Sequence, residues 1–250
     1  MSTDLKTDIE KMPRRLISLR EKYSEICSPP SVVISGAWNI PGTISWLELK
    51  GKGNKTNREL ETIGTKIEKD VERVTENIIN AGWKVIVGGA LGVDYFATKK
   101  IYEMRKLDQL YLMFPSKKYS YLEKLTKAHM DEDKITRQQL DENSDLLNII
   151  SKESPKSIYE PGFEDCKEEH YTIRNSREAF LGDYLCAFHI DNTEGTKDTI
   201  QKFIELKKFV YVYRYEILKE GWAKEFKEHF YNIEKSGLTE NEVEKIFGSN

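Results

Sequence analysis

Short apolar runs alternate with amphipathic stretches along most of this chain. Five runs predict strands: "SVVIS" (31–35), "WKVIVGG" (83–89), "QLYLMF" (109–114), "DYLCAFHI" (183–190) and "FVYVYRY" (209–215). Helical spacing of apolar residues predicts helices from Ile63 to about Gly82 and over 93–106, 119–145, 170–181 and 196–207. Strands that alternate with helices indicate an α/β fold, with a doubly wound, mostly parallel, Rossmann-like sheet.

The two ends of the chain follow a different pattern. Apolar residues at helical spacing predict an N-terminal helix that stops at Pro29-Pro30, and two polar helices are expected after residue 215. We therefore expect three parts: an N-terminal helix (1–30), a Rossmann-like nucleotide-binding domain (31–215) and a C-terminal helical extension (216–250).

Two stretches inside the central part are less regular. The connection over 36–62 is long and contains glycine, proline and two tryptophans, which is typical of a functional or disordered loop. The run "LLNIIS" (146–151) is a candidate fourth strand, and residues 152–168 read as a loop.

Composition narrows the function classes. The 250 residues carry a net charge of −3, so no overall basic field indicates nucleic acid. No apolar run approaches the ~20 residues that span a bilayer, so we expect no membrane partner and a cytoplasmic location. The three cysteines are far apart, and Cys166 with His170 would supply only two ligands, so no metal site is expected.

The glycine-rich end of the second predicted strand is the first candidate site. The turn between this strand and the following helix contains Gly88, Gly89, Ala90 and Gly92. Glycine lets a ligand approach the backbone closely, and a helix N-terminus offers unpaired N–H groups. Such a turn can hold a phosphate, although a tight turn that binds no ligand has the same sequence pattern. Asp94 is expected to cap the helix, or else to accept a hydrogen bond from a ribose hydroxyl.

Two further motifs follow. Arg174-Asn175 lies on a helix that leads into a strand, and an arginine directed at the carboxyl end of the sheet would bind phosphate in a bidentate manner. By itself, such an arginine more often belongs to a solvated helix face. Gly195-Thr196 opens another strand-to-helix turn, where Thr196 could cap the helix or contact phosphate and Thr199 lies one turn further on.

In this order, these motifs resemble the SLOG superfamily of Rossmann-like nucleotide-binding proteins, and within it the DprA (Smf) family. The resemblance covers about residues 31–215 and includes Phe114-Pro115 after the third strand. It implies a site for a nucleotide or a nucleic-acid phosphate built from Ser35-Gly36, residues 88–94, Arg174-Asn175 and Gly195-Thr196.

Departures from the family patterns bear on catalysis. The related LOG phosphoribohydrolases carry P-G-G-x-G-T-x-x-E, whereas this chain has "DNTEGTKDT", with Thr199 in place of their glutamate. Glu194 or Glu178 could supply a catalytic carboxylate from another position.

We therefore expect a protein that binds a nucleotide or a related phosphorylated ligand. The alternatives are a nucleotide N-glycosidase and a DprA-like single-stranded DNA binder. No further cofactor is indicated, and a homo-oligomer is compatible with the sequence.

Overall fold

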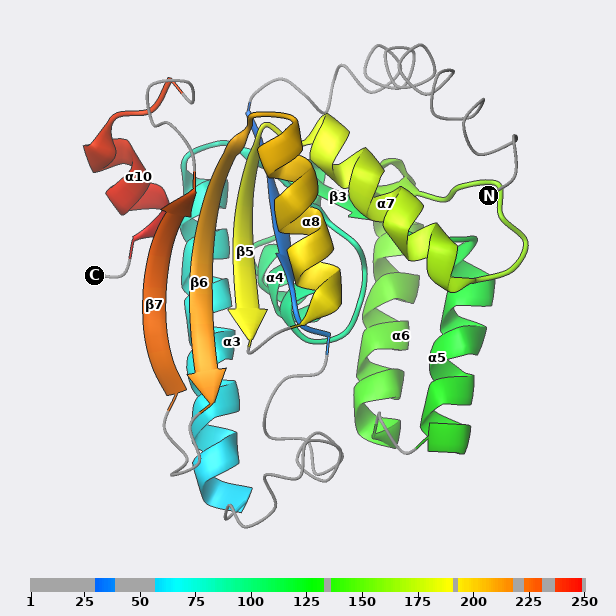
Figure 1. Ribbon diagram of the computed structural model, residues 1–250. Coiled ribbons are helices and arrows are strands. Elements are labelled where there is room, and N and C mark those ends of the chain that lie inside the picture. The colour runs from blue at the N-terminus through cyan, green and yellow to red at the C-terminus, as the bar shows by residue number, and fades with distance from the viewer. Residues whose placement is uncertain are drawn as a thin grey trace, which may run out of the picture.

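The computed structural model describes residues 30–38, 57–132, 136–190, 193–217, 223–230 and 237–248. Its centre is a seven-stranded sheet in the order β4-β3-β2-β1-β5-β6-β7 (Figure 1). Strands β1 to β6 pair in parallel, and β7 pairs with β6 in the antiparallel direction. The strands are β1 (Ser31–Gly36), β2 (Lys84–Val87), β3 (Leu110–Met113), β4 (Ile158–Tyr159), β5 (Tyr184–Ile190), β6 (Phe209–Ile217) and β7 (Ala223–Phe230).

Helices cover both faces of the sheet, as expected for a doubly wound fold. One face carries α3 (Asn57–Asn80), α4 (Val93–Glu103), α5 (Lys118–Glu132), α6 (Arg137–Glu153) and α10 (Glu240–Phe247). The other face carries α7 (Glu168–Leu181) and α8 (Glu194–Glu205), which lie in front of the sheet in Figure 1. Short 3₁₀ turns precede β3 (η1, Leu107–Gln109) and β4 (η2, Pro155–Ser157). None of the helices in these described ranges is long and apolar enough to cross a bilayer.

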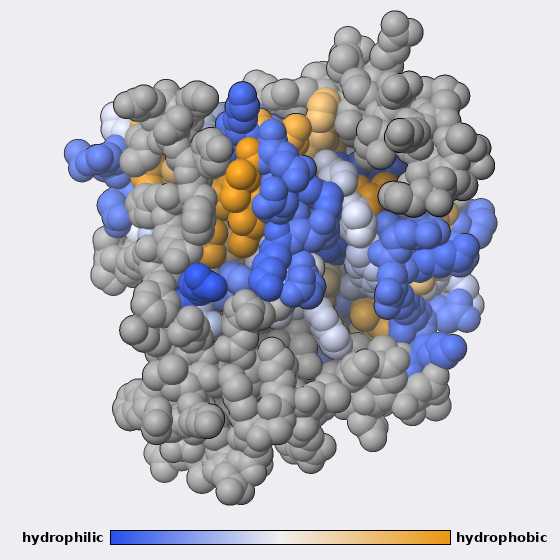
Figure 2. Space-filling view, in the orientation of Figure 1, coloured by the Kyte–Doolittle hydropathy of each residue, from blue (hydrophilic) through white to orange (hydrophobic). Residues whose placement is uncertain are grey.

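Alternating strand residues feed two separate cores. Val32 and Ile34 of β1 belong to the core under α3 and α4, whereas Val33 belongs to the core under α7 and α8. A parallel strand buried on both faces needs an unbroken apolar run, which explains "SVVIS". The outer surface of α8 is hydrophilic (Figure 2), as its amphipathic sequence requires.

The strands and helices expected from the sequence are mostly confirmed, with three corrections. Residues 146–151 lie within α6 and not in a strand, because Leu146, Leu147 and Ile150 follow helical spacing and bury one face. Strand β4 arises inside the stretch read as a loop. Residues 223–230 form β7 where a polar helix was expected, so the sheet continues past residue 215. The expected helix near the C-terminus is confirmed as α10, with Thr239 as its N-cap.

Two expected features lie outside the described residues: the helix of residues 1–29 and most of the 36–62 connection, including Trp46.

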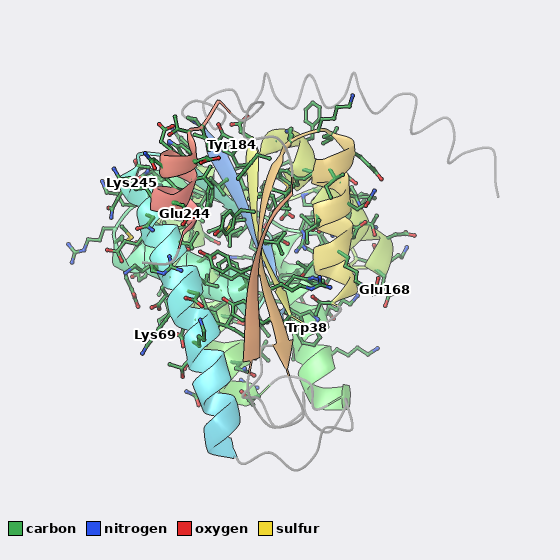
Figure 3. The ribbon with its side chains drawn as sticks, turned by 60° about the vertical axis from the view of Figure 1, so that its left-hand side comes forward. Trp38, Lys69, Glu168, Tyr184, Glu244 and Lys245 are labelled. Carbon is green, nitrogen blue, oxygen red and sulfur yellow. The ribbon has the colours of Figure 1, made fainter. Side chains whose placement is uncertain are left out.

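The strand order creates a switch point beside β1. The chain moves outward from β1 through β2 and β3 to β4, and then returns to place β5 on the other side of β1. In open α/β sheets, ligands bind outside the carboxyl ends of the strands at such a point. Trp38, just after β1, marks this edge in Figure 3, and Tyr184, at the start of β5, lies at the opposite edge.

Candidate functional site

The turn between β2 and α4 is held by the protein's own packing. Gly89 and Gly92 have φ of 70° and 67°, the left-handed region that glycine adopts without strain. Gly92 is the N-cap of α4, and a Cβ at this position would lie 2.7 Å from the carbonyl oxygen of Trp38. A Cβ on Gly89 would lie 2.7 Å from the Phe114 ring. These glycines are therefore required by close packing, and their contact with a ligand stays a prediction.

Asp94 stabilises this turn from inside the fold. Its Oδ2 accepts a hydrogen bond from the backbone N–H of Ala90 at 3.2 Å, and its side chain is buried. The expected capping role is wrong, because Gly92 is the N-cap and no side chain caps α4. Burial raises the pKa of Asp94, and the charge of Arg174 and the hydrogen bonds from the turn oppose that rise.

Arg174 reaches the same turn from α7. Its Nη1 donates to the carbonyl oxygen of Gly88 at 3.3 Å, and its guanidinium lies 5.6 Å from the centre of the Tyr171 ring. Only 12% of its side chain is exposed, so the interpretation as a solvated helix face is wrong. Arg174 thus lies at the carboxyl end of β2, and its contact with a phosphate stays a prediction.

Glu178, one helical turn after Arg174, is a buried carboxylate at this edge. Its Oε1 lies 3.5 Å from Nε of Arg174 and accepts no hydrogen bond from the part of the chain that the structure describes. Burial raises the pKa of Glu178 to about 7, with Arg174 lowering it and Asp94 raising it further. The carboxyl group therefore holds a proton for a substantial part of the time near neutral pH.

Asn175 connects Arg174 to α8. Its Oδ1 accepts from Nη2 of Arg174 at 2.9 Å, and its Nδ2 donates to Oδ2 of Asp198 at 2.8 Å. Asp198 also pairs with Lys202 and keeps 35% of its side chain exposed. Sequence reasoning missed Asp198. Its position four residues before Lys202, on the helix that begins after β5, could have indicated an ion pair there.

The predicted residues of α8 fall into two groups. Thr196 and Thr199 are buried and bonded locally: Oγ1 of Thr193 donates to Thr196, and Oγ1 of Thr199 donates to the carbonyl oxygen of Gly195 at 3.2 Å. Glu194 is 84% exposed and pairs with Lys197. By contrast, a Cβ on Gly195 would meet no atom within 4 Å, so the backbone is accessible there.

Ser35 and Gly36 complete the edge at the end of β1. Both pair with β5, opposite Ala187 and Phe188. A Cβ on Gly36 would lie 2.8 Å from the carbonyl oxygen of Phe188, so this glycine allows β1, β5 and α4 to approach closely. Its contact with a ligand also stays a prediction.

The charges at this edge nearly cancel. With every group ionised, the three carboxylates of Asp94, Glu178 and Asp198 face two cations, Arg174 and Lys202, which leaves one net negative charge. Protonation of Glu178 brings the sum to zero. Among the described residues, no three His, Cys, Asp or Glu side chains converge where they could hold a metal ion. An edge with almost no net charge suits recognition of a ligand through hydrogen bonds and helix N-termini.

The strand order defines an open, doubly wound α/β protein, and this edge lies at the switch point of its sheet, where such folds place their ligands. No protein-family model and no curated protein matches the sequence.

Among solved structures, the chain is similar to DNA processing protein A from Helicobacter pylori, described for its single-stranded DNA binding mode. That match has 16% identity and a TM-score of 0.45, and covers 74% of this chain and 65% of that one. It is also similar to DprA from Streptococcus pneumoniae, with 14% identity and a TM-score of 0.36, over 72% of this chain and 58% of that one. The chain thus spans less than two thirds of either structure. Both belong to the family that the sequence motifs resemble.

Proposed function

We propose that this protein binds a nucleotide or a related phosphorylated ligand at the carboxyl edge of β1, β2 and β5. The observation that supports the proposal is the position of Arg174. Its guanidinium donates a hydrogen bond to the carbonyl oxygen of Gly88 at the switch point of the sheet. A largely buried arginine at a strand end is costly to place, and a planar guanidinium is well suited to phosphate.

Two helix N-termini at the same edge support this proposal. Helices α4 and α8 begin directly after β2 and β5, and neither has a side chain that caps its first turn. The N–H of Val93, the first in α4, already donates to the carbonyl oxygen of Ala37 at 3.2 Å. The following N–H groups of α4, the first N–H groups of α8 and the positive end of each helix dipole favour an anion. The open space beside Gly195 leaves room for a ligand to approach α8. A phosphate on α8 would place the rest of a nucleotide towards β1 and Arg174.

Isothermal titration calorimetry with AMP, ATP and NAD tests the proposal. We expect binding by the native protein and weaker binding by Arg174→Lys, which keeps the charge and loses the fork of donors. The loss of one charge-assisted hydrogen bond, roughly 1.5–3 kcal/mol, corresponds to about tenfold or more in Kd. Arg177→Lys is the matched control, because Arg177 lies on the same helix over the Tyr159 and Phe163 rings. Absence of binding to all three nucleotides contradicts the proposal.

Single-stranded DNA is the second candidate ligand, and two exposed aromatic side chains favour it. Trp38 follows the end of β1 with 43% of its surface exposed, and Tyr119 follows the end of β3 with 76% exposed. Bases of any sequence can stack on such rings. Fluorescence anisotropy with a labelled oligonucleotide tests this candidate. Binding that weakens steeply with salt and is lost in a Trp38→Ala, Tyr119→Ala double variant would favour DNA over a free nucleotide.

A further inference from the structure

Arg174 divides its hydrogen bonds unequally among its neighbours. Nη1 donates to Gly88, while Nε and Nη2 donate to Oδ1 of Asn175 at 3.2 and 2.9 Å. Glu178 is left with a contact of 3.5 Å to Nε and no hydrogen bond to Oε1, although its side chain is only 2% exposed. A buried carboxylate with an unsatisfied oxygen is disfavoured relative to its protonated form.

Asp94 is the other buried carboxylate near Arg174, and its surroundings differ. The backbone N–H of Ala90 donates to Asp94, which stabilises the ionised form. Two buried carboxylates therefore compete for one guanidinium, and Asp94 has the additional hydrogen bond. Burial raises the pKa of Asp94 as well, but the hydrogen bond from Ala90 opposes that rise, so Glu178 is the carboxyl group that we expect to hold the proton.

We propose that Glu178 is a positioning residue of this site, which holds Arg174 against the β2 turn and takes up a proton when an anionic ligand engages Arg174. The inference rests on the proposed function, since it needs an anion at the switch point. An anion beside Arg174 would compete for the guanidinium and add a negative charge close to Glu178. Both effects favour the protonated carboxyl group.

The titratable groups around Glu178 leave it as the proton acceptor near neutral pH. Tyr171 of α7 and Tyr121 of α5 both have raised pKa values, first of all through burial, so both stay neutral. Asp94 of α4 has its turn hydrogen bonds, and on α8 Asp198 and Lys202 pair with each other. Because burial raises the pKa of Glu178 to about 7, the carboxyl group is only partly protonated in the free protein near neutral pH. Ligand binding then draws in the remaining part of the proton.

Calorimetry of the tightest binder among AMP, ATP and NAD, at pH 7 in two buffers of different ionisation enthalpy, measures this proton uptake. The proton change of the ligand itself is common to all variants. We expect the native protein to take up a measurable fraction of a proton more than Glu178→Gln, because Glu178 is only partly protonated in the free protein. Glu205→Gln, which alters an exposed carboxylate in the last turn of α8, should behave as the native protein does.

The pH profile of NAD binding gives a second readout on the native protein alone, because the diphosphate of NAD does not titrate between pH 6 and 8. We expect Kd to rise about threefold or more over this range, since one unit of pKa change corresponds to tenfold. Glu178→Gln should bind at pH 8 about as tightly as the native protein binds at pH 6, whereas a merely structural role would weaken binding at every pH. Equal proton uptake in native protein and Glu178→Gln, or a flat native profile, overturns the inference alone. Failure of all three nucleotides to bind overturns the proposed function.

Discussion

The side-chain amide of Asn175 joins α7 to α8 through Asp198: its Nδ2 donates to Oδ2 of that carboxylate at 2.8 Å. The same amide accepts from Arg174 through its oxygen, so one buried side chain links the β2 turn to the first turns of α8. The two halves of the sheet on either side of the switch point are thus connected by polar side chains as well as by strand pairing.

Loss of that amide should destabilise the protein. Asn175→Ala leaves a largely buried arginine and a half-buried aspartate without a shared partner, at a cost of about 1–3 kcal/mol for each buried group left unsatisfied. We expect urea denaturation to show a free energy of unfolding lower by about 2 kcal/mol. Asn148→Ala is the control, because Asn148 accepts only an exposed bond from Lys118, at 3.1 Å. An equal, small effect of both substitutions would show that the link contributes little to stability.

The glycine turn should tolerate substitution only where space exists. Gly92→Ala adds a Cβ at φ of 67° and 2.7 Å from the carbonyl oxygen of Trp38, so the backbone of the turn must shift. Strain of this kind costs on the order of 1–3 kcal/mol. Gly195→Ala meets no atom within 4 Å and lies in a helix, where alanine is the better residue. Thermal denaturation should show a lower Tm for Gly92→Ala and an unchanged or higher Tm for Gly195→Ala; the reverse order would contradict this packing.

The sequence predicted the sheet well because its interior strands are buried on both faces. Continuous apolar runs such as "KVIV" have no other plausible location in a chain of this size, and β1, β2, β3, β5 and β6 all appeared where expected. The edge strands carry no such signal. β4 has only two residues, and β7 reads "AKEFKEHF", whose charged positions also suit a helix surface. Pairing with β6 decides its conformation, and this long-range pairing is invisible in the local pattern.

The sequence predicted which residues lie at the candidate site, but not the hydrogen bonds and ion pairs that join them. Short-range motifs located Gly88, Asp94, Arg174 and Asn175, because each lies at a strand end or precedes one. The direction in which Arg174 points depends on how α7 crosses the sheet. Besides its sequence neighbours Asn175 and Glu178, it contacts the carbonyl oxygen of Gly88, which is 86 residues away and which no local motif indicates. Asp198 was missed for the same reason, since its partner Asn175 is 23 residues away.

The stability of the protein should fall as pH rises through the range in which Glu178 ionises. Burial raises the pKa of this carboxyl group from 4.5 to about 7, so between these values the folded state binds more protons than the unfolded state. Stability then decreases with rising pH, and the contribution is lost once pH exceeds about 7. A shift of this size corresponds to about 3 kcal/mol.

Urea denaturation of native protein and Glu178→Gln at pH 5 and pH 8 isolates this contribution. The glutamine side chain stays neutral, so we expect its free energy of unfolding relative to the native protein to rise by about 2–3 kcal/mol between the two pH values. Asp94 also has a raised pKa and is present in both proteins, so the comparison reports the charge of Glu178 together with its coupling to Asp94. A difference that does not change with pH would show that Glu178 is ionised throughout.

The last prediction separates binding from hydrolysis. Cleavage of a nucleotide N-glycosidic bond needs a carboxylate against the ribose, either to offset the developing positive charge or to activate water, and acid–base help alone is worth ~10²–10⁴ in rate. Thr199, in the place of the glutamate of the LOG pattern, is buried and bonded to the carbonyl oxygen of Gly195. Glu194 is 84% exposed and Glu178 is buried beside Arg174, so we expect neither to act on a ribose. Asp198 is half-buried at this edge and is the carboxylate to replace if activity is found.

We expect chromatography of AMP, ATP and NAD, incubated for hours with purified protein, to show no release of adenine or nicotinamide. Release that grows in proportion to the protein and disappears in Asp198→Asn would contradict this prediction and establish an N-glycosidase in place of a binding protein.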